Sequence, residues 1–162
     1  MRPEREERFA YALVSAAPLQ DTNAAGIGIV FKAQDRSTLR TVCQALPDTD
    51  PLAAAYEAMM RVLEEALGTG VRRLTIYTDL ADVVAQLTDD APVPRGLLVA
   101  HLKTRGMINQ LASVKFIAAT SDRFSARLLA QSARLPGDGR PAPQPPPRGG
   151  RQLKLIAENA SA

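Results

Sequence analysis

The stretch GVRRLTIYTDLADVVAQ, residues 70–86, decides the topology of this chain. Its segment RLTIYT, residues 73–78, is short and apolar and predicts a buried strand. A helical pattern over residues 51–67 precedes it and ends at two glycines, Gly68 and Gly70. A strand that follows a helical crossover lies parallel to an earlier strand of its sheet. Asp79 comes next and is predicted to begin a short helix, where aspartate is a favourable N-cap.

Three further strands are predicted toward the N-terminus. They are FAYALV at 9–14, AGIGIVFK at 25–32 and TLRTVCQAL at 38–46, and short turns separate them. Strands joined in this way favour an antiparallel meander. Cys43, the only cysteine, is predicted to be a buried residue of the third strand.

The remaining elements are helices and one more strand. Asp50 is a plausible N-cap for the helix at 51–67, and Pro51 suits its first position. Residues 95–112 predict a helix, and SVKFIAA at 113–119 predicts a fifth strand. A last helix is expected from Asp122 to Arg134. Its inward residues are expected to be Phe124, Leu128 and Leu129.

The composition is that of one globular domain with a distinct tail. Hydrophobic residues make up 46% of the chain and charged residues 23%. We expect the domain to span residues 1–134. Residues 135–162 are expected to be a flexible basic tail, because 136–150 holds six prolines and four glycines. Residues 134–162 contain five basic and two acidic residues, whereas the remainder contains 15 of each and is neutral.

Several functional classes are excluded by these counts. No apolar run approaches the ~20 residues needed to cross a bilayer, so a cytoplasmic protein without membrane contact is expected. One cysteine and one histidine, His101, leave no internal disulfide and no Cys/His metal spacing. The neutral body lacks the basic footprint of a general nucleic-acid-binding protein. Abundant alanine and arginine are typical of a GC-rich bacterial genome.

Four segments resemble the ribonuclease H-like family, which includes type 1 ribonucleases H and reverse-transcriptase-like domains. SAAPLQDTNAAGIGIVF, residues 15–31, is similar to the family's first hairpin, and DPLAAAYEAMMRVL, residues 50–63, to its first helix. Residues 70–86 resemble its pattern GxxxLxIxxDSxxVVxQ, and 120–130 its closing helix. The resemblance covers about residues 9–134. It implies a five-stranded mixed sheet, three antiparallel strands first and then two helix-connected ones, flanked by helices.

The resemblance also implies where catalytic carboxylates would lie. The family hydrolyses the RNA strand of a hybrid with two Mg²⁺ ions, which are held by four acidic residues. Matched residue by residue, these positions fall on Ser15, Ala55, Asp79 and Arg127. Only Asp79 is acidic, so we expect no catalytic set and no cofactor. Mg²⁺ is expected only if other ligands substitute, and the weak candidates are Asp79, Asp82 and Asp122.

Arg127 and Asp79 each have two interpretations. Asp79 could cap the helix that follows it, which we favour, or it could be a metal ligand. Arg127 could pair with Asp79 across the former metal site, which we favour, or it could contact phosphate. Candidate nucleic-acid-binding residues are Arg123, Arg127, Arg148 and Arg151. A wider basic set is also considered to line one side, namely Arg72, Arg73, Lys103, Arg105, Arg123 and Arg127.

Three functions remain open at this point. The first is a catalytically degenerate domain that binds nucleic acid weakly or acts as a scaffold. The second is an interaction module that forms a homodimer or engages a protein partner through the tail. The third is an active metal-dependent RNA–DNA hybrid ribonuclease with non-standard ligands.

Overall fold

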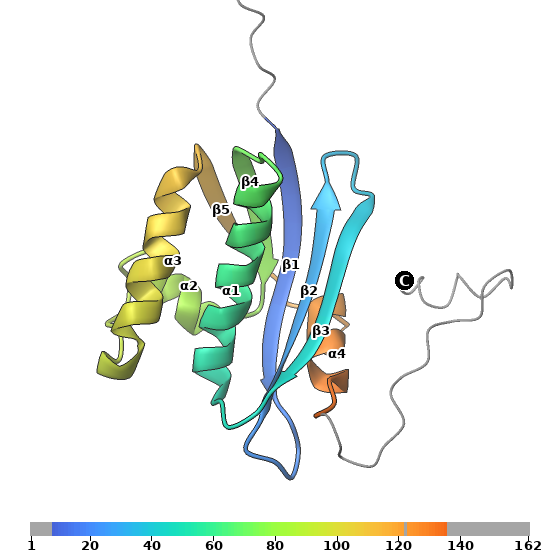
Figure 1. Ribbon diagram of the computed structural model, residues 1–162, viewed down its shortest axis with the longest axis vertical. Coiled ribbons are helices and arrows are strands. Elements are labelled where there is room, and N and C mark those ends of the chain that lie inside the picture. The colour runs from blue at the N-terminus through green and yellow to red at the C-terminus, as the bar shows by residue number, and fades with distance from the viewer. Residues whose placement is uncertain (1–7, 122, 136–162) are drawn as a thin grey trace, which may run out of the picture.

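The computed structural model describes residues 8–121 and 123–135 (Figure 1). The elements in chain order are β1 (Phe9–Pro18), β2 (Ala25–Ala33), β3 (Thr38–Leu46), α1 (Pro51–Gly68), β4 (Arg73–Thr78), α2 (Ala81–Leu87), the 3₁₀ turn η1 (Arg95–Leu97), α3 (Leu98–Gln110), β5 (Ser113–Ala118) and α4 (Ser125–Ser132). The strands form one sheet in the order β3-β2-β1-β4-β5. The predicted five-stranded mixed sheet flanked by helices is therefore confirmed. Within the described ranges, no helix is both long and apolar enough to cross a membrane.

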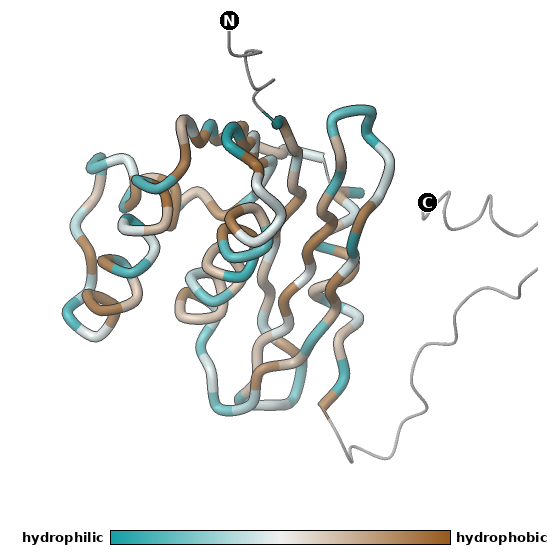
Figure 2. Tube along the Cα trace, turned by 45° about the horizontal axis from the view of Figure 1, so that its top comes forward, coloured by the Kyte–Doolittle hydropathy of each residue, from teal (hydrophilic) through white to brown (hydrophobic). Residues whose placement is uncertain are grey.

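The connections between strands explain their directions. β1 pairs antiparallel with β2, and β2 pairs antiparallel with β3, because short turns join them. β4 and β5 each follow a helix, and they pair parallel with β1 and β4, respectively. The register of β1 with β4 places Val14 beside Thr78, so Ser15 lies next to the residue that follows β4. Figure 2 shows hydrophobic residues along β1 and β2, and hydrophilic residues at the turn between β2 and β3.

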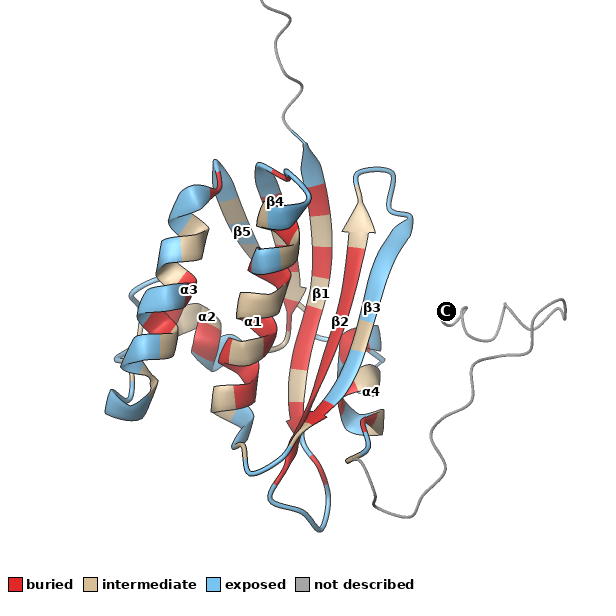
Figure 3. Ribbon diagram, viewed as in Figure 1, coloured by how far each residue is buried: buried red, intermediate tan, exposed pale blue. Residues whose placement is uncertain are grey.

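Helix α1 covers one face of the sheet and supplies much of the core (Figure 3). The carboxylate of Asp50 accepts a hydrogen bond from the Ala53 amide at 2.8 Å, and Pro51 occupies the first turn, so the predicted N-cap is confirmed. The helix buries one stripe of residues, Ala54, Ala55, Tyr56, Ala58, Met59, Val62, Leu63 and Ala66. Because this stripe faces β1 and β2, it fixes the helix over the middle of the sheet.

A buried polar network joins α1 to α2 and α3. The hydroxyl of Tyr56 donates to Oε1 of Gln86 at 2.6 Å and lies 3.2 Å from Nδ1 of His101. All three residues are buried, so His101 is part of the packing between α1 and α3. Burial raises the pKa of the Tyr56 phenol above its ordinary value near 10.

Helix α4 lies on the opposite face, unusually close to β2. A Cβ atom on Gly26 would lie 1.9 Å from the carbonyl oxygen of Ala130, and one on Gly28 would lie 2.0 Å from that of Ala126. Glycine is therefore needed at both positions for the helix to approach. The inward side of α4 consists of small residues, so the prediction that Leu128 faces inward is wrong: its side chain is 51% exposed.

Other differences from the sequence predictions are local. Cys43 is exposed at the sheet edge and not buried, and its thiol lies 3.2 Å from the carbonyl oxygen of Leu129. The helix predicted over 95–112 begins as the 3₁₀ turn η1, and α3 ends at Gln110. Leu135, assigned to the tail, packs against a small cluster that includes Leu19 and Ala133. The rest of the predicted tail lies outside the described residues.

Candidate functional site at the ends of β1 and β4

Asp79 follows the end of β4, next to the central strand β1, and its neighbour Thr78 fixes this position. The Thr78 hydroxyl donates to the Val14 carbonyl at 2.7 Å and accepts from the Leu80 amide at 3.1 Å, which fastens the end of β4 to β1. The predicted N-cap role of Asp79 is wrong. Helix α2 begins one residue later, with Leu80 as its cap and no side-chain capping bond. The Asp79 carboxylate is consequently available for a contact across the sheet.

That contact is an ion pair with Arg127. Nη1 of Arg127 lies 2.8 Å from Oδ2 of Asp79, which confirms the predicted pairing. The Asp79 side chain is only 12% exposed, whereas that of Arg127 is 47% exposed. Oδ1 of Asp79 is buried and has no hydrogen-bond partner among the described residues. One carboxylate oxygen of Asp79 thus has a hydrogen bond from Arg127, and the other has none among the described residues.

The other two positions implied by the resemblance lie beside this pair. Ser15 is fully buried, and its hydroxyl oxygen also has no hydrogen-bond partner within the part of the chain that the structure describes. Ala55 is buried on α1 and lines a hollow of about 430 Å³ together with Ala16 and Asp79. The fold therefore brings Ser15, Ala55, Asp79 and Arg127 together from β1, α1, the end of β4 and α4.

Two more aspartates line the same hollow. Asp82 is exposed on the first turn of α2, and the Asp50 carboxylate is bonded to the backbone at the start of α1. Sequence reasoning assigned Asp50 only a capping role, although its place before α1 put it at this end of the sheet. Within residues 8–121 and 123–135, no three Asp, Glu, His or Cys side chains gather closely enough to hold a metal ion. Asp122, the remaining metal candidate, lies outside the described residues.

The wider basic set does not gather on one side. Arg72 and Arg73 lie at the start of β4 and Asp79 follows its end, so a strand about 20 Å long at ~3.3 Å per residue separates them. Arg105 is engaged elsewhere: it pairs with Asp89 at 3.0 Å. Arg123 is exposed just before α4, near Arg127 in sequence. Arg148 and Arg151 lie outside the described residues.

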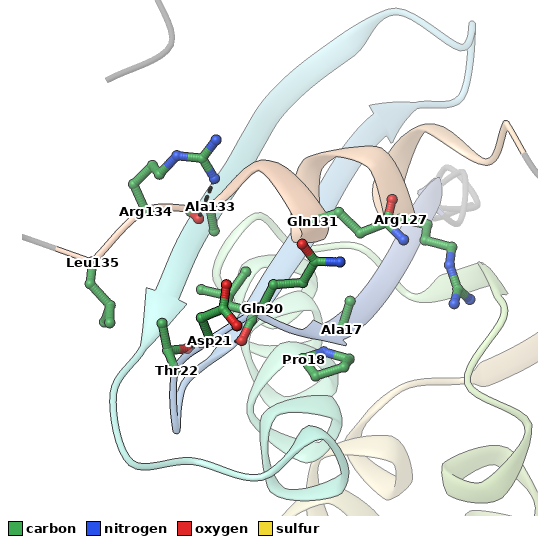
Figure 4. A pocket seen from close by; sticks show the side chains of 11 residues that line it. Ala17, Pro18, Gln20, Asp21, Thr22, Arg127, Gln131, Ala133, Arg134 and Leu135 are labelled. Atoms are coloured by element: carbon green, nitrogen blue, oxygen red, sulfur yellow. Dashed lines mark hydrogen bonds between the residues drawn. The ribbon is translucent and has the colours of Figure 1, made fainter. Parts of the chain in front are cut away.

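A second hollow lies on the other side of Arg127 (Figure 4). It has a volume of about 710 Å³ and lies between the turn joining β1 to β2 and the exposed side of α4. Figure 4 shows Gln20, Asp21 and Thr22 on the turn and Gln131 on α4, while Arg127 and Arg134 lie at opposite ends. Sequence reasoning missed Gln131 and Arg134. Gln131 lies four residues after Arg127, and this spacing was the available signal, because it places both on one side of α4. Arg134 lies beyond the end of the helix.

Fold and site together define a ribonuclease H-type α/β domain. Residues 13–133 match the reverse transcriptase-like family, and the chain belongs to this family. No curated protein matches it in sequence.

Solved structures with 18–20% sequence identity share the fold. The N-terminal RNase H domain of Rv2228c from Mycobacterium tuberculosis, a fusion with maltose-binding protein, has a TM-score of 0.70 at 20% identity, covering 76% of this chain and 91% of that chain. RNase H1 from Halobacterium salinarum has a TM-score of 0.68 at 18% identity, with coverage of 75% and 94%. LC11-RNase H1 in complex with an RNA/DNA hybrid has a TM-score of 0.67 at 19% identity, with coverage of 76% and 95%.

Proposed function

We propose that this chain is a ribonuclease H-like domain that binds nucleic acid without hydrolysing it. The observation that carries the proposal is the Asp79–Arg127 ion pair at the point where four structural elements converge. The guanidinium group of Arg127 is hydrogen-bonded to one carboxylate oxygen of Asp79, and a metal ion at this site would need that oxygen as a ligand. The domain keeps the shape of the fold, while its central charges neutralise each other.

Two Mg²⁺ ions do not fit the residues at this site. Mg²⁺ takes near-octahedral sets of oxygen ligands, and a two-metal site needs several carboxylates. Serine, alanine and arginine stand at three of the four converging positions, and Asp79 alone is acidic. A unit charge ~4 Å away at an effective dielectric of about 20 contributes roughly 4 kcal/mol, so Arg127 would repel a divalent cation by about twice that. We derive no hydrolytic step for the domain.

Binding to nucleic acid is supported by the relatives and by the surface arginines. The LC11-RNase H1 structure holds an RNA/DNA hybrid. In this chain Arg127 is half-exposed at the site, Arg123 precedes the same helix, and the tail sequence adds Arg148 and Arg151. The chain has no tryptophan and few aromatic residues, so base stacking contributes little. The expected binding is weak, depends on phosphate contacts and falls with salt.

The direct test is a combined cleavage and binding assay. The full chain is mixed with a labelled RNA–DNA hybrid, single strands and duplex DNA, with Mg²⁺, with Mn²⁺ and with a chelator. We expect no cleavage, and binding that weakens as salt rises. Chelator-sensitive cleavage that Asp79→Asn abolishes would refute the proposal and indicate the active alternative.

Charge variants assign the binding residues. Arg127→Gln and the double variant Arg148→Ala/Arg151→Ala should each lower the salt slope, by about 0.7–0.9 for each phosphate that the variant no longer neutralises. Asp79→Asn should tighten binding, because it frees Arg127. Arg95→Ala, which removes a charge at η1 far from α4 in sequence, is the matched control and should leave the slope unchanged. Equal effects of all these variants would mean that only net charge matters.

A second candidate function is a protein-interaction module. Leu98, Val99 and Leu102 form an exposed apolar group on α3, with 45%, 67% and 67% of their surfaces accessible. Absence of both cleavage and nucleic-acid binding would favour this function.

A further inference from the structure

Strand β3 is an exposed edge of the sheet. Its only neighbour within the described residues is β2, so one side of its backbone has no strand partner there. Six of its nine residues are exposed, whereas β2 is mostly buried and half of β1 is buried (Figure 3). Unpaired edge strands are templates for pairing with another chain unless proline, lysine, a bulge or a covering segment blocks them.

Little of this protection is present on β3. The sequence TLRTVCQAL contains no proline and no lysine. The register shift opposite Phe31 and Lys32 leaves Leu39 out of the ladder with β2 and limits the regular edge to residues 40–46. This regular edge is seven residues long, and its middle lies near Val42 and Cys43.

The two sides of β3 are covered unequally by the helices. Toward α1, Arg40 pairs with Glu65 at 3.2 Å, and Gln44 accepts a hydrogen bond from Arg61. Between strand and helix lies an open hollow of about 540 Å³ with an apolar floor that includes Ile29, Phe31 and Val42. Toward α4, the Cys43 thiol lies 3.2 Å from the carbonyl oxygen of Leu129, and Ala45 is buried in a cluster with Ala133. A second sheet edge could therefore approach β3 without displacing a helix.

The charges at the two ends of β3 indicate which partner fits. The first end carries three basic residues, Lys32, Arg36 and Arg40, against Asp35 and Glu65, which pairs with Arg40, so one positive charge is in excess. The second end is followed by two acidic residues, Asp48 and Asp50. Antiparallel pairing with a second β3 places the basic end of one copy beside the acidic end of the other. Parallel pairing would instead put like charges side by side. The edge is thus self-complementary about a two-fold axis near its middle, as closed homodimers require.

We propose that two copies of this chain associate through antiparallel pairing of β3 with β3, about a two-fold axis near Val42 and Cys43. The result is a continuous ten-stranded sheet with the two α1 helices on the same face. A strand pair buries less than the ~800 Å² per partner of a standard interface, so dimerisation in the micromolar range is expected. This proposal does not depend on nucleic-acid binding.

The test begins with the full chain without nucleic acid, studied by sedimentation equilibrium from about 1 to 300 μM, which brackets the expected weak interface. We expect a reversible monomer–dimer equilibrium. A short bismaleimide should then join two copies through Cys43, because facing or diagonal Cβ atoms of paired strands lie about 5–8 Å apart. The control is Cys43→Ser combined with Val99→Cys, which moves the thiol to α3.

A matched pair of substitutions at Thr41 tests the geometry. Thr41 is exposed on β3. Thr41→Lys should weaken the dimer roughly tenfold, because it places two like charges near the axis. Thr41→Val should leave it intact or tighten it, since valine favours strands. Circular dichroism confirms that each variant is folded.

Three results would overturn the proposal. They are a monomer at every concentration, a dimer that Thr41→Lys does not weaken, and cross-linking through the α3 thiol in place of Cys43. The last result would assign the interface to Leu98, Val99 and Leu102.

Discussion

The Asp79–Arg127 ion pair makes a quantitative prediction about stability. The perturbation is a double-mutant cycle with Asp79→Asn, Arg127→Gln and the two combined. Two unit charges ~4 Å apart interact by roughly 4 kcal/mol at an effective dielectric of about 20, and by about 1 kcal/mol in water. The Arg127 side chain is 47% exposed and that of Asp79 only 12%, so the interaction energy of the pair lies between these two values. We expect a coupling energy of about 1–2 kcal/mol.

Arg127→Gln alone should have the larger single effect. It leaves a mostly buried carboxylate without its counter-charge, and Oδ1 of Asp79 already has no hydrogen-bond partner in the described part of the chain. The expected loss is about 2–3 kcal/mol, whereas Asp79→Asn leaves an exposed arginine that water solvates and should cost about 1 kcal/mol.

Urea unfolding monitored by circular dichroism at 222 nm measures all four proteins, since the chain has no tryptophan for fluorescence. A coupling energy near zero, with Arg127→Gln as stable as the parent, would refute the assignment of Arg127 as the partner of this carboxylate.

Further predictions concern the packing of the domain. Gly28→Ala should destabilise the protein by about 2–4 kcal/mol in urea, because the new Cβ collides with the carbonyl of Ala126. In Gly106→Ala the new Cβ has no atom within 4 Å, so this substitution should instead stabilise the protein by about 0.5–1 kcal/mol. Equal effects of the two substitutions would contradict the close approach of α4 to β2. Tyr56→Phe should cost about 1–2 kcal/mol at neutral pH, because it leaves buried partners unsatisfied. Burial raises the pKa of Tyr56 in the folded state, so its contribution to the free energy of unfolding is complete below pH ~10 and is lost as the pH rises through the folded pKa. Thermal unfolding measured across that pH range should show a steeper loss of stability at alkaline pH in the parent than in Tyr56→Phe.

Local sequence signals accounted for most of the fold. The short apolar runs and the turns between them predicted every strand, and Asp50 with Pro51 predicted the start of α1. These signals are local because the alternation of apolar residues and the capping chemistry act within a few residues. The resemblance added the convergence of Ser15, Ala55, Asp79 and Arg127, which no local pattern contains.

Errors arose where a neighbour in space competed with a local preference. Asp79 is a good N-cap by type, yet its carboxylate pairs with Arg127, 48 residues away. Leu128 is apolar, yet it is exposed, because the glycines of β2 admit only small side chains beneath α4. Cys43 was expected to be buried, but β3 lies at the sheet edge, and strand order is set by pairing and not by hydrophobicity.

The sequence by itself determined the order and type of the elements and the mixed character of the sheet. It also places serine, alanine and arginine at three of the four positions to which the resemblance assigns carboxylates. Only the tertiary structure decided that Arg127 pairs with Asp79. It also decided that, among the residues that the structure describes, Ser15 and Asp79 each keep one buried oxygen without a hydrogen-bond partner and β3 has a strand neighbour on one side only. The physical reason is that hydrophobic periodicity and capping are short-range properties. Ion pairing, burial and edge exposure depend on which distant segments the sheet brings together.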